Sequence, residues 1–347
     1  MFSVTINDID LILRDYGISG KCDTFSELQR YHYEKDDPNS KDVRLIVKVE
    51  TDCGKAVVIR FKNEVDVTLD IVTAQSRFAV LLADYGIETP RIYTSKEQYA
   101  RWYQIDGYEV IVTVEDFVTG ELWLVDAETA EKTGKLLAKM HNVAEEADLH
   151  VENEVLFDPL ANNGNDLFDF KAFVKHKDFL CSIDKTLYEA VEREHANLVQ
   201  KLRAFEKEAK YAVQGDISDC NLFVTQKGEI GVFDFNRCGD NVLYFDAIMQ
   251  AIFVARLMDY PAELAENPEP VILPAFLKGY NNIRPFTAEQ RETFPYFYAL
   301  VSAFWLNHMM WDEHSLANAV EKADSDAVLQ WMKEIYNRIT YLPSMPI

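Results

Sequence analysis

Hydrophobic positions in the first third of the chain alternate between helical and strand-like spacing. Residues 7–16 and 71–85 have helical spacing, and both stretches end in the string DYGI, whose glycine is typical of the residue that closes a helix. Between them, RLIVKVET and KAVVIRFK are rich in β-branched residues and predict two strands joined by a turn at residues 52–54. Further strands are predicted at residues 27–34, 91–94 and 108–118. This region therefore predicts a mainly antiparallel sheet with a helix packed on it.

Helical spacing dominates after residue 126. Residues 127–141 place apolar side chains on one face, residues 185–210 predict a long charged helix, and Thr287 with Gln290 resembles a capping box. The 347 residues are too many for one small core, and TGE after the last strand predicts a hinge. We therefore predict a bilobal α+β chain, with an antiparallel-sheet N-terminal lobe at residues 1–117 and a mainly helical C-terminal lobe at residues 118–347.

The net charge of −23 narrows the classes of partner. A chain this acidic is repelled by nucleic-acid phosphates and by anionic membrane surfaces and favours cationic partners, although a role in solubility alone explains the charge equally well. The start of the chain does not resemble a secretory signal, and the longest apolar runs are too short to span a bilayer. Five scattered cysteines without paired spacing are typical of a reducing compartment. We expect a cytoplasmic protein with no nucleic-acid, membrane or obligate protein partner.

Candidate chemistry is concentrated between Gln214 and Asp234. Apolar runs on either side of Lys227–Gly228 predict a hairpin, and a two-residue turn there would place Asn221 directly opposite Asp234. An amide oxygen beside a carboxylate is a suitable site for Mg²⁺, which prefers oxygen ligands. Asp216 precedes Asn221 in a loop and supplies a further carboxylate that could orient a hydroxyl. The alternative from geometry alone is a surface hairpin with turn-forming Asp and Asn residues.

The same segment carries a family resemblance. GDISDCN followed by VFDF resembles the HGDxxxxN and IDF motifs of the aminoglycoside phosphotransferase and choline kinase superfamily, which has a protein-kinase-like fold. The resemblance implies that Asp216 is the catalytic base and that Asn221 and Asp234 bind Mg²⁺. It also implies that Asp246 braces the catalytic region. Gln214 stands where the family usually has histidine, and we expect glutamine to hold the loop by similar hydrogen bonds.

The resemblance extends to the nucleotide site. It places Arg60 at the position that grips the ATP phosphates, and Lys62, on the same face of the strand, is the rival candidate. Gln75 replaces the glutamate that usually forms an ion pair with the phosphate-binding residue. We therefore expect Gln75 to make a neutral hydrogen bond to that cation. The polar loop at residues 35–42 is expected to cover the phosphates, since no GxGxxG loop is present. Backbone groups of the hinge are expected to bind adenine; they belong to Glu115, Asp116 and Phe117.

These assignments predict an ATP- and Mg²⁺-dependent kinase that phosphorylates a hydroxyl of a small molecule. The acceptor is expected to be cationic or polyhydroxylated, resembling an aminoglycoside, choline or homoserine, with residues 156–169 as one wall of its pocket. The aromatic run at residues 294–311 predicts a helical core, and the alternative is that Trp305 lines the acceptor pocket. His141 is interpreted as a hydrogen-bonded core residue. The competing function is a nucleotide-binding regulatory protein that has lost turnover, because Gln214 and Gln75 depart from the family pattern.

Overall fold

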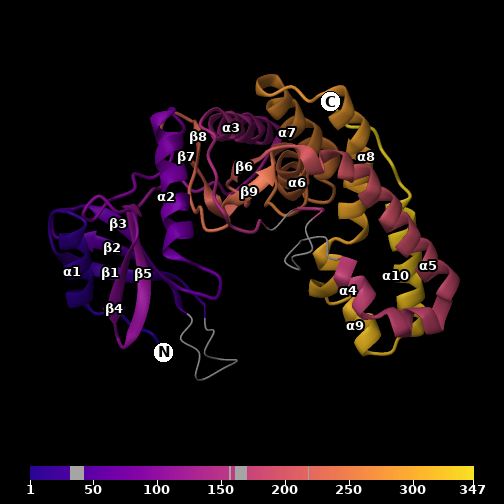
Figure 1. The fold of residues 1–347 in the computed structure, drawn as a ribbon, viewed down its shortest axis with the longest axis horizontal. Coiled ribbons are helices and arrows are strands. Elements are labelled where there is room, and N and C mark those ends of the chain that lie inside the picture. The colour runs from indigo at the N-terminus through magenta and orange to yellow at the C-terminus, as the bar shows by residue number, and fades with distance from the viewer. Residues whose placement is uncertain (32–42, 156–157, 161–169, 218) are drawn as a thin grey trace. The chain divides into compact units, whose positions relative to one another are not determined.

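The computed structural model describes residues 1–31, 43–155, 158–160, 170–217 and 219–347 (Figure 1). The chain forms two compact units. The first consists of Met1–Trp123, Val143–Asn153 and Asp219–Cys238, and the second of Leu124–Asn142, Glu154–Ser218 and Gly239–Ile347. Asn221 and Asp234 therefore belong to the first unit, and Asp216 belongs to the second.

A five-stranded antiparallel sheet, with strand order β1-β2-β3-β5-β4, forms the centre of the first unit. The predicted strands RLIVKVET and KAVVIRFK are β2 and β3. The strand predicted at residues 91–94 is wrong, because only an isolated bridge joins Ile92 to Glu115, and β4 lies further along the chain. The strands are β1 (Cys22–Tyr31), β2 (Val43–Thr51), β3 (Ala56–Asn63), β4 (Arg101–Ile105) and β5 (Tyr108–Asp116).

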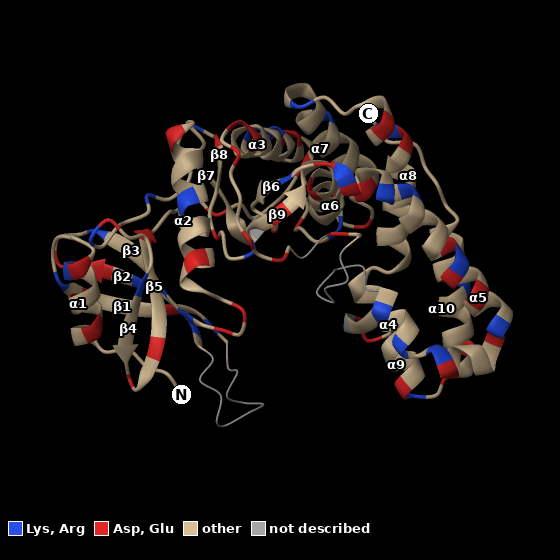
Figure 2. Cartoon of the chain, in the orientation of Figure 1, with Lys and Arg blue, Asp and Glu red and all other residues tan. Residues whose placement is uncertain are grey.

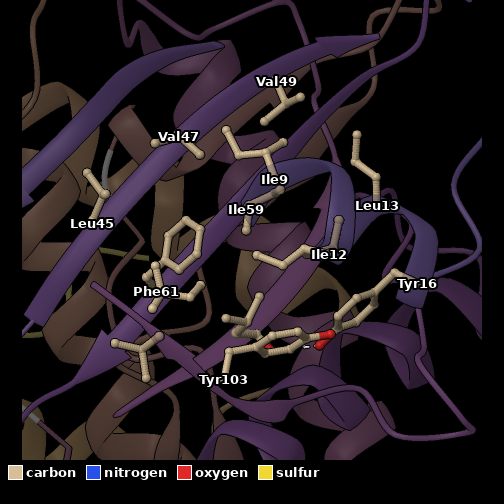
Figure 3. Close-up of a cluster of buried hydrophobic side chains, with 14 of the residues drawn as sticks. Ile9, Ile12, Leu13, Tyr16, Leu45, Val47, Val49, Ile59, Phe61 and Tyr103 are labelled. Atoms are coloured by element: carbon tan, nitrogen blue, oxygen red, sulfur yellow. Dashed lines mark hydrogen bonds between the residues drawn. The ribbon is translucent and has the colours of Figure 1, made fainter. Parts of the chain in front are cut away.

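Helix α1 (Ile6–Asp15) covers one face of this sheet. Thr5 and Asp8 form a capping box at its start, which satisfies N–H groups that the first helical turn leaves unpaired. Its apolar side chains Ile9, Ile12 and Leu13 are fully buried against the inward-facing residues of the sheet. Figure 3 shows this core, with Ile9, Ile12, Leu13 and Tyr16 facing Leu45, Val47, Val49, Ile59, Phe61 and Tyr103.

Both DYGI strings end helices as predicted. α1 is followed by Gly17, and α2 (Leu69–Asp84) is followed by Gly86; both glycines have positive φ. After each glycine, the isoleucine N–H bonds back to a carbonyl in the last helical turn, from Ile18 to Leu13 and from Ile87 to Leu82. This is the Schellman pattern, in which the last carbonyls of the helix find donors.

The second unit is mainly helical and is built around α6 (Leu243–Arg256), which is buried on almost every side. A short ladder pairs β6 (Lys210–Val213) with β9 (Gly239–Val242) next to the start of α6. The capping box at Thr287 and Gln290 is confirmed and begins α8. α3 (Ala127–Glu146) begins in this unit, and its last residues belong to the first unit. The other helices are α4 (Phe170–Lys175), α5 (Lys177–Leu202), α7 (Glu269–Ile283), α8 (Ala288–Ala303), α9 (Leu316–Glu321) and α10 (Ser325–Ile339), with short turns η2 (Arg203–Lys207) and η4 (Asn307–Trp311).

The charged helix predicted at residues 185–210 exists with different ends. It is α5, which begins earlier and ends at Leu202, because the chain then tightens into η2 and enters β6. Figure 2 shows acidic and basic residues in turn along α5, as expected for a helix with a solvated face. None of the described helices combines the length and the apolar character that crossing a membrane requires.

Candidate active site

The hairpin that carries Asn221 and Asp234 differs from the prediction by one residue. Residues 225–229 separate β7 (Leu222–Val224) from β8 (Ile230–Val232). Because the N–H of Thr225 donates to the carbonyl of Glu229 at 2.9 Å, the loop itself has three residues, 226–228, and Gly228 has φ of 77°, a common hairpin geometry. The predicted two-residue turn is therefore wrong, and the N–H of Phe233 donates to the carbonyl of Asn221 at 3.0 Å. Asp234 lies one residue beyond that pair.

Asp234 itself has an uncommon backbone conformation. Its φ is 55°, in the left-handed region that few residues other than glycine occupy. Aspartate tolerates this conformation because its short carboxylate can bond to the local backbone. Here Oδ1 accepts from the N–H of Asn236 at 3.1 Å. Residues in this region often occur at functional sites, where the surrounding structure holds them.

Arg60 holds the side chain of Asp234. The Arg60 guanidinium donates from Nη1 to Asp234 Oδ2 at 3.1 Å, and from Nε and Nη2 to Glu115 Oε1 at 3.1 and 2.8 Å. The sheet register explains the second contact, because Arg60 is opposite Thr113 and Glu115 is the diagonal neighbour on the same face. The Arg60 side chain is only 8% exposed. It joins two carboxylates that lie far apart in the sequence.

The charges of these neighbouring side chains shift the pKa values of Asp234, Arg60 and Lys62. Burial opposes the charged form of Asp234, but Arg60 and then Lys62 outweigh it, and the pKa of Asp234 is lowered. Burial also opposes the charge on Arg60, yet Asp234 and Glu115 raise its pKa. Burial, followed by repulsion from Arg60, lowers the pKa of Lys62 to about 8. The Asp234 carboxylate is therefore ionised at neutral pH, which is the form that a ligand of Mg²⁺ requires.

The segment that follows Asp234 is held by two further side chains. Lys62 Nζ donates to Asn236 Oδ1, and Gln75 Nε2 donates to the carbonyls of Asn236 and Cys238 at 3.1 and 3.2 Å. The expectation that Gln75 bonds to Arg60 is therefore wrong. Glu115 pairs with Arg60 instead, and Gln75 supports the backbone next to the candidate metal ligand.

The predicted adenine-binding residues are at the end of β5. The N–H of Asp116 donates to the carbonyl of Arg91 at 2.9 Å, and the N–H of Phe117 donates to the carbonyl of Ala56 at 3.1 Å. An adenine ring could accept from these two N–H groups only by displacing the bonds that secure the end of the strand. The Glu115 side chain is engaged with Arg60, so its contribution to a nucleotide site would be through that pair.

The candidate base, Asp216, lies in the second unit on a loop after β6. Gln214 is fully buried, and its Oε1 accepts from the N–H of Asp216 at 2.7 Å. The N–H of Ile217 donates to Gln250 Oε1 on α6 at 2.9 Å. Glutamine at position 214 thus holds the loop by a hydrogen bond, as expected, and α6 holds it from the other side.

A buried hydrogen-bond network continues from Gln250. Its Nε2 donates to Asp246 Oδ1 at 3.2 Å, and Asp246 Oδ2 is 2.9 Å from His141 Nε2. His141 Nδ1 is 2.8 Å from the hydroxyl of Tyr280, so Nε2 carries the ring proton if the tyrosine donates. His141 is therefore a hydrogen-bonded core residue, as interpreted from the sequence. Asp246 acts on the catalytic loop through Gln250.

The predicted site residues are thus divided between the two units. Arg60, Lys62, Gln75 and Glu115 surround Asp234 and the two residues after it, while Asp216 is held by Gln214 and α6. Among the described residues there is no group of three or more His, Cys, Asp or Glu that could hold a metal ion. The predicted metal site uses only one carboxylate and one amide, with phosphates expected to complete it. Residues 35–42, and most of 156–169, lie outside the described residues.

Sequence reasoning missed three contributors. The Glu115 side chain pairs with Arg60, Asn236 accepts from Lys62, and Gln250 holds the backbone after Asp216. Of these three, only Asn236 had a signal in the sequence. It lies two residues after Asp234, and Lys62 likewise lies two residues after Arg60, so the two pairs have the same spacing.

The fold of this chain has known relatives. A model of the phosphotransferase enzyme family matches residues 42–286. An amicoumacin kinase in complex with AMP-PNP, Ca²⁺ and Ami is 15% identical, with a TM-score of 0.62 over 96% of this chain and 95% of that one. A microcompartment-associated aminopropanol kinase is 13% identical, with a TM-score of 0.57 over 96% and 95%. A spectinomycin phosphotransferase in complex with ADP and its antibiotic is 10% identical, with a TM-score of 0.53 over 97% and 98%.

These structures are too distant in sequence to show more than a shared fold, which is α+β with an N-terminal antiparallel sheet. Among curated proteins, none matches the chain in sequence. The match to the family model is stronger evidence than these structures. It covers well over half of the chain, and every predicted site residue lies within it. The chain therefore belongs to the phosphotransferase enzyme family.

Proposed function

We propose that this protein transfers the γ-phosphoryl group of ATP to a hydroxyl of a small, cationic or polyhydroxylated acceptor, with Mg²⁺ as cofactor. Aminoglycoside-like, choline-like and homoserine-like molecules are the candidate classes. The acceptor oxygen bonds to the γ-phosphorus, the bond from that phosphorus to the ADP oxygen breaks, and Asp216 takes the hydroxyl proton. Arg60 and Lys62 bind the phosphates. Backbone groups at Glu115, Asp116 and Phe117 are proposed for adenine, which would displace the bonds that the Asp116 and Phe117 N–H groups make within the first unit.

The observation that carries the proposal is the ion pair between Arg60 and Asp234. These residues are 174 positions apart, and the sequence assigns them separately to phosphate binding and to metal binding. Their contact within one unit gives the phosphates and the metal adjacent binding groups. The lowered pKa of Asp234 supports its role as a ligand. Bound Mg²⁺ would neutralise charge on the transferred phosphoryl group.

Asn221 and Asp216 complete the proposed roles. Asn221 is buried directly before β7, and an amide oxygen there is suitable for a hard cation. The N–H groups of Asp216 and Ile217 are both bonded to buried glutamines, so the loop that presents the Asp216 carboxylate is fixed on both sides. A fixed carboxylate can orient a hydroxyl without a reorganisation cost at each turnover.

Kinase activity over a panel of acceptors tests the proposal. Asp216→Asn should lower kcat by roughly 10²–10⁴-fold, the usual range for loss of a general base, while ATP still raises the melting temperature. Glu263→Gln, which changes an exposed carboxylate in the second unit, is the matched control and should retain activity. Thermal stabilisation by ATP without product from any acceptor would instead favour the nucleotide-binding regulatory protein. A cytoplasmic location stays a prediction.

A further inference from the structure

A backbone contact joins the predicted hinge to the hairpin of the candidate metal ligands. The hinge residues, 119–121, lie beside β7, the first strand of that hairpin. The N–H of Val224 donates to the carbonyl of Gly120 at 2.6 Å, and an antiparallel bridge pairs Glu121 with Phe223. The two pairs belong to the first unit. We call this contact the hinge–hairpin bridge.

The hinge–hairpin bridge requires a glycine at position 120. The φ of Gly120 is 97°, in the left-handed region that glycine adopts without steric cost. A Cβ atom added there would lie closer than 3.0 Å to the carbonyl oxygen of Val224, a separation that real Cβ atoms almost never show. That oxygen belongs to the backbone of a strand and cannot rotate away. Any larger residue at position 120 must therefore push the hinge and β7 apart.

The other edge of the hairpin is held in a similar way. The N–H of Val232 on β8 donates to the carbonyl of Glu88, in the segment that follows α2, at 3.0 Å. A Cβ atom at Gly231 would be 2.7 Å from the same carbonyl oxygen, so this approach is also close. The hinge, β7, β8 and the segment after α2 thus form one backbone ladder. The hairpin has backbone partners on both sides, unlike the surface hairpin that was the alternative from the sequence.

The bridge lies close along the chain to both proposed ends of the nucleotide site. Phe117 precedes Gly120 by three residues, and Asn221 precedes Val224 by three residues. An extended chain covers at most about 3.6 Å per residue, so each Cα atom is within about 11 Å of its bridge residue. The N–H of Phe233, directly before the second candidate metal ligand, donates to the carbonyl of Asn221. Both candidate ligands are therefore tied to the strand that contacts the hinge.

Arg60 provides a second link between the same two segments. Its guanidinium donates to Glu115, at the end of β5, and to Asp234. This link consists of charged side chains, and the phosphates and Mg²⁺ compete for these charges when they bind. The hinge–hairpin bridge consists of neutral backbone groups, for which those ligands do not compete. It can therefore keep the two segments at one separation while the charged contacts rearrange.

A fixed separation matters for a ligand that binds at both ends. Once one end of such a ligand is bound, the other end is held near its own site at a high effective concentration. This advantage is largest when the separation of the two sites matches the ligand, and it is reduced when the sites move relative to each other.

We propose that Gly120 is a positioning residue for ATP, which fixes the separation between the adenine-binding residues and the metal ligands through the hinge–hairpin bridge. This inference rests on the proposed function, because it requires adenine at residues 115–117 and Mg²⁺ at the hairpin. Gly120 itself contacts no reacting atom. It acts through the segments on either side of the bridge.

Calorimetric titration with two ligands tests the proposal. MgATP can bind at both ends, whereas Mg-tripolyphosphate keeps three phosphates and the metal but lacks adenosine. The ratio of their dissociation constants measures the adenosine preference of the protein. Gly120→Ala should reduce this preference by roughly tenfold or more, through weaker binding of MgATP. The affinity for Mg-tripolyphosphate should change by less than about twofold, because the groups around Asp234 stay together.

Gly107→Ala is the matched control. Gly107 also has a positive φ, of 77°, and among the described residues an added Cβ atom would meet nothing within 4 Å. This variant has a comparable backbone strain without displacing a neighbour, and it should keep the preference of the wild-type protein. Equal weakening of both ligands in Gly120→Ala would mean that the bridge only supports the metal hairpin. An unchanged preference would mean that the bridge positions nothing. Either result overturns the proposal.

Hydrogen exchange of the wild-type protein gives a measurement that needs no variant. The Val224 amide can exchange only when its bond to Gly120 opens. If opening abolishes the adenosine preference, saturating MgATP must slow this exchange more than saturating Mg-tripolyphosphate does, by about the factor that Gly120→Ala removes. Equal exchange rates with the two ligands would overturn the proposal even if Gly120→Ala does not fold.

These measurements separate the inference from the proposed function, because none of them needs turnover. If the wild-type protein binds both ligands equally well, adenine is not bound, and the inference fails together with the adenine assignment. The base and metal assignments would stand. If the wild-type protein prefers MgATP and Gly120→Ala keeps that preference, only the inference fails. A lack of phosphoryl transfer would count against the reaction and leave the binding results as they are.

Discussion

The two segments that carry the candidate catalytic residues are held by different forces. In the first unit, the side chains of residues 234–238 are held by cations, since Arg60 binds Asp234 and Lys62 binds Asn236. The backbone carbonyls of this segment are held by the amides of Gln75 and Asn153. In the second unit, residues 214–217 are held by amide groups, through Gln214 and Gln250, with Asp246 and His141 buried behind them.

The difference corresponds to what each segment is proposed to do. ATP and Mg²⁺ are charged, so they can compete for Arg60 and Lys62 and rearrange the contacts around Asp234 when they bind. The loop of Asp216 has to present a carboxylate at a constant position, and amide bonds inside a core respond little to salt or to a charged ligand. We therefore expect the first segment to respond to nucleotide and the second to contribute mainly to stability and positioning.

The largest effect is expected from Asp246→Ala. This change removes the acceptor for Gln250 Nε2 and the partner of His141 Nε2, and both remain buried without it. Two buried groups left unpaired should lower the free energy of unfolding by about 3 kcal/mol, measured by urea denaturation. Glu263→Ala, at an exposed site, is the control and should change it by less than about 0.5 kcal/mol. A loss below about 1 kcal/mol for Asp246→Ala would mean that the network is not stabilising.

The next effect concerns Gln75→Glu, which restores the residue common in the family. Because Gln75 donates to two carbonyls, a glutamate there would face two acceptors and lose both bonds. We expect the free energy of unfolding to fall by about 2 kcal/mol, and the affinity for ATP not to rise. Gln104→Glu, an exposed glutamine of the same unit, is the control. Tighter ATP binding in Gln75→Glu would show that the glutamate re-pairs with Arg60.

The sequence predicted elements whose signals are local. DYGI ends two helices, Thr287 and Gln290 cap another, and the β-branched runs form β2 and β3. The sequence also contains a local hairpin signal at Asp106 and Gly107, which both have positive φ and form the two-residue turn between β4 and β5. This dipeptide is a strong hairpin signal, and it indicates a strand directly before residue 106, where β4 lies, and not at residues 91–94.

The rest depended on long-range pairing, which a single sequence does not contain. Glu115 meets Arg60 because β3 pairs with β5 across an intervening helix, so Gln75 was expected in its place. The predicted register of the hairpin before Asp234 differs from the observed register by one residue. The reason is that a glycine at position 228 suits both a two-residue and a three-residue loop. Gln250 lies inside a buried helix, where periodicity predicts packing and does not reveal a hydrogen bond to a loop.

The smallest effect tests whether Lys62 shares the phosphate-binding role with Arg60. With a pKa of about 8, Lys62 is protonated in about half of the molecules at pH 8. Phosphates bound nearby would stabilise the ammonium form and raise this pKa, so ATP binding at pH 8 should take up a fraction of a proton, about 0.5 at most. Arg60 keeps its proton throughout and contributes nothing to this uptake.

Calorimetry in two buffers of different ionisation enthalpy measures the uptake. It should shrink at pH 6.5, where Lys62 is already protonated before ATP binds, and it should be absent in Lys62→Met. Lys21→Met, which changes an exposed lysine of the same unit, should leave it intact. If ATP binds at pH 8 without any uptake, Arg60 alone binds the phosphates, and Lys62 serves to hold Asn236 and the segment after Asp234.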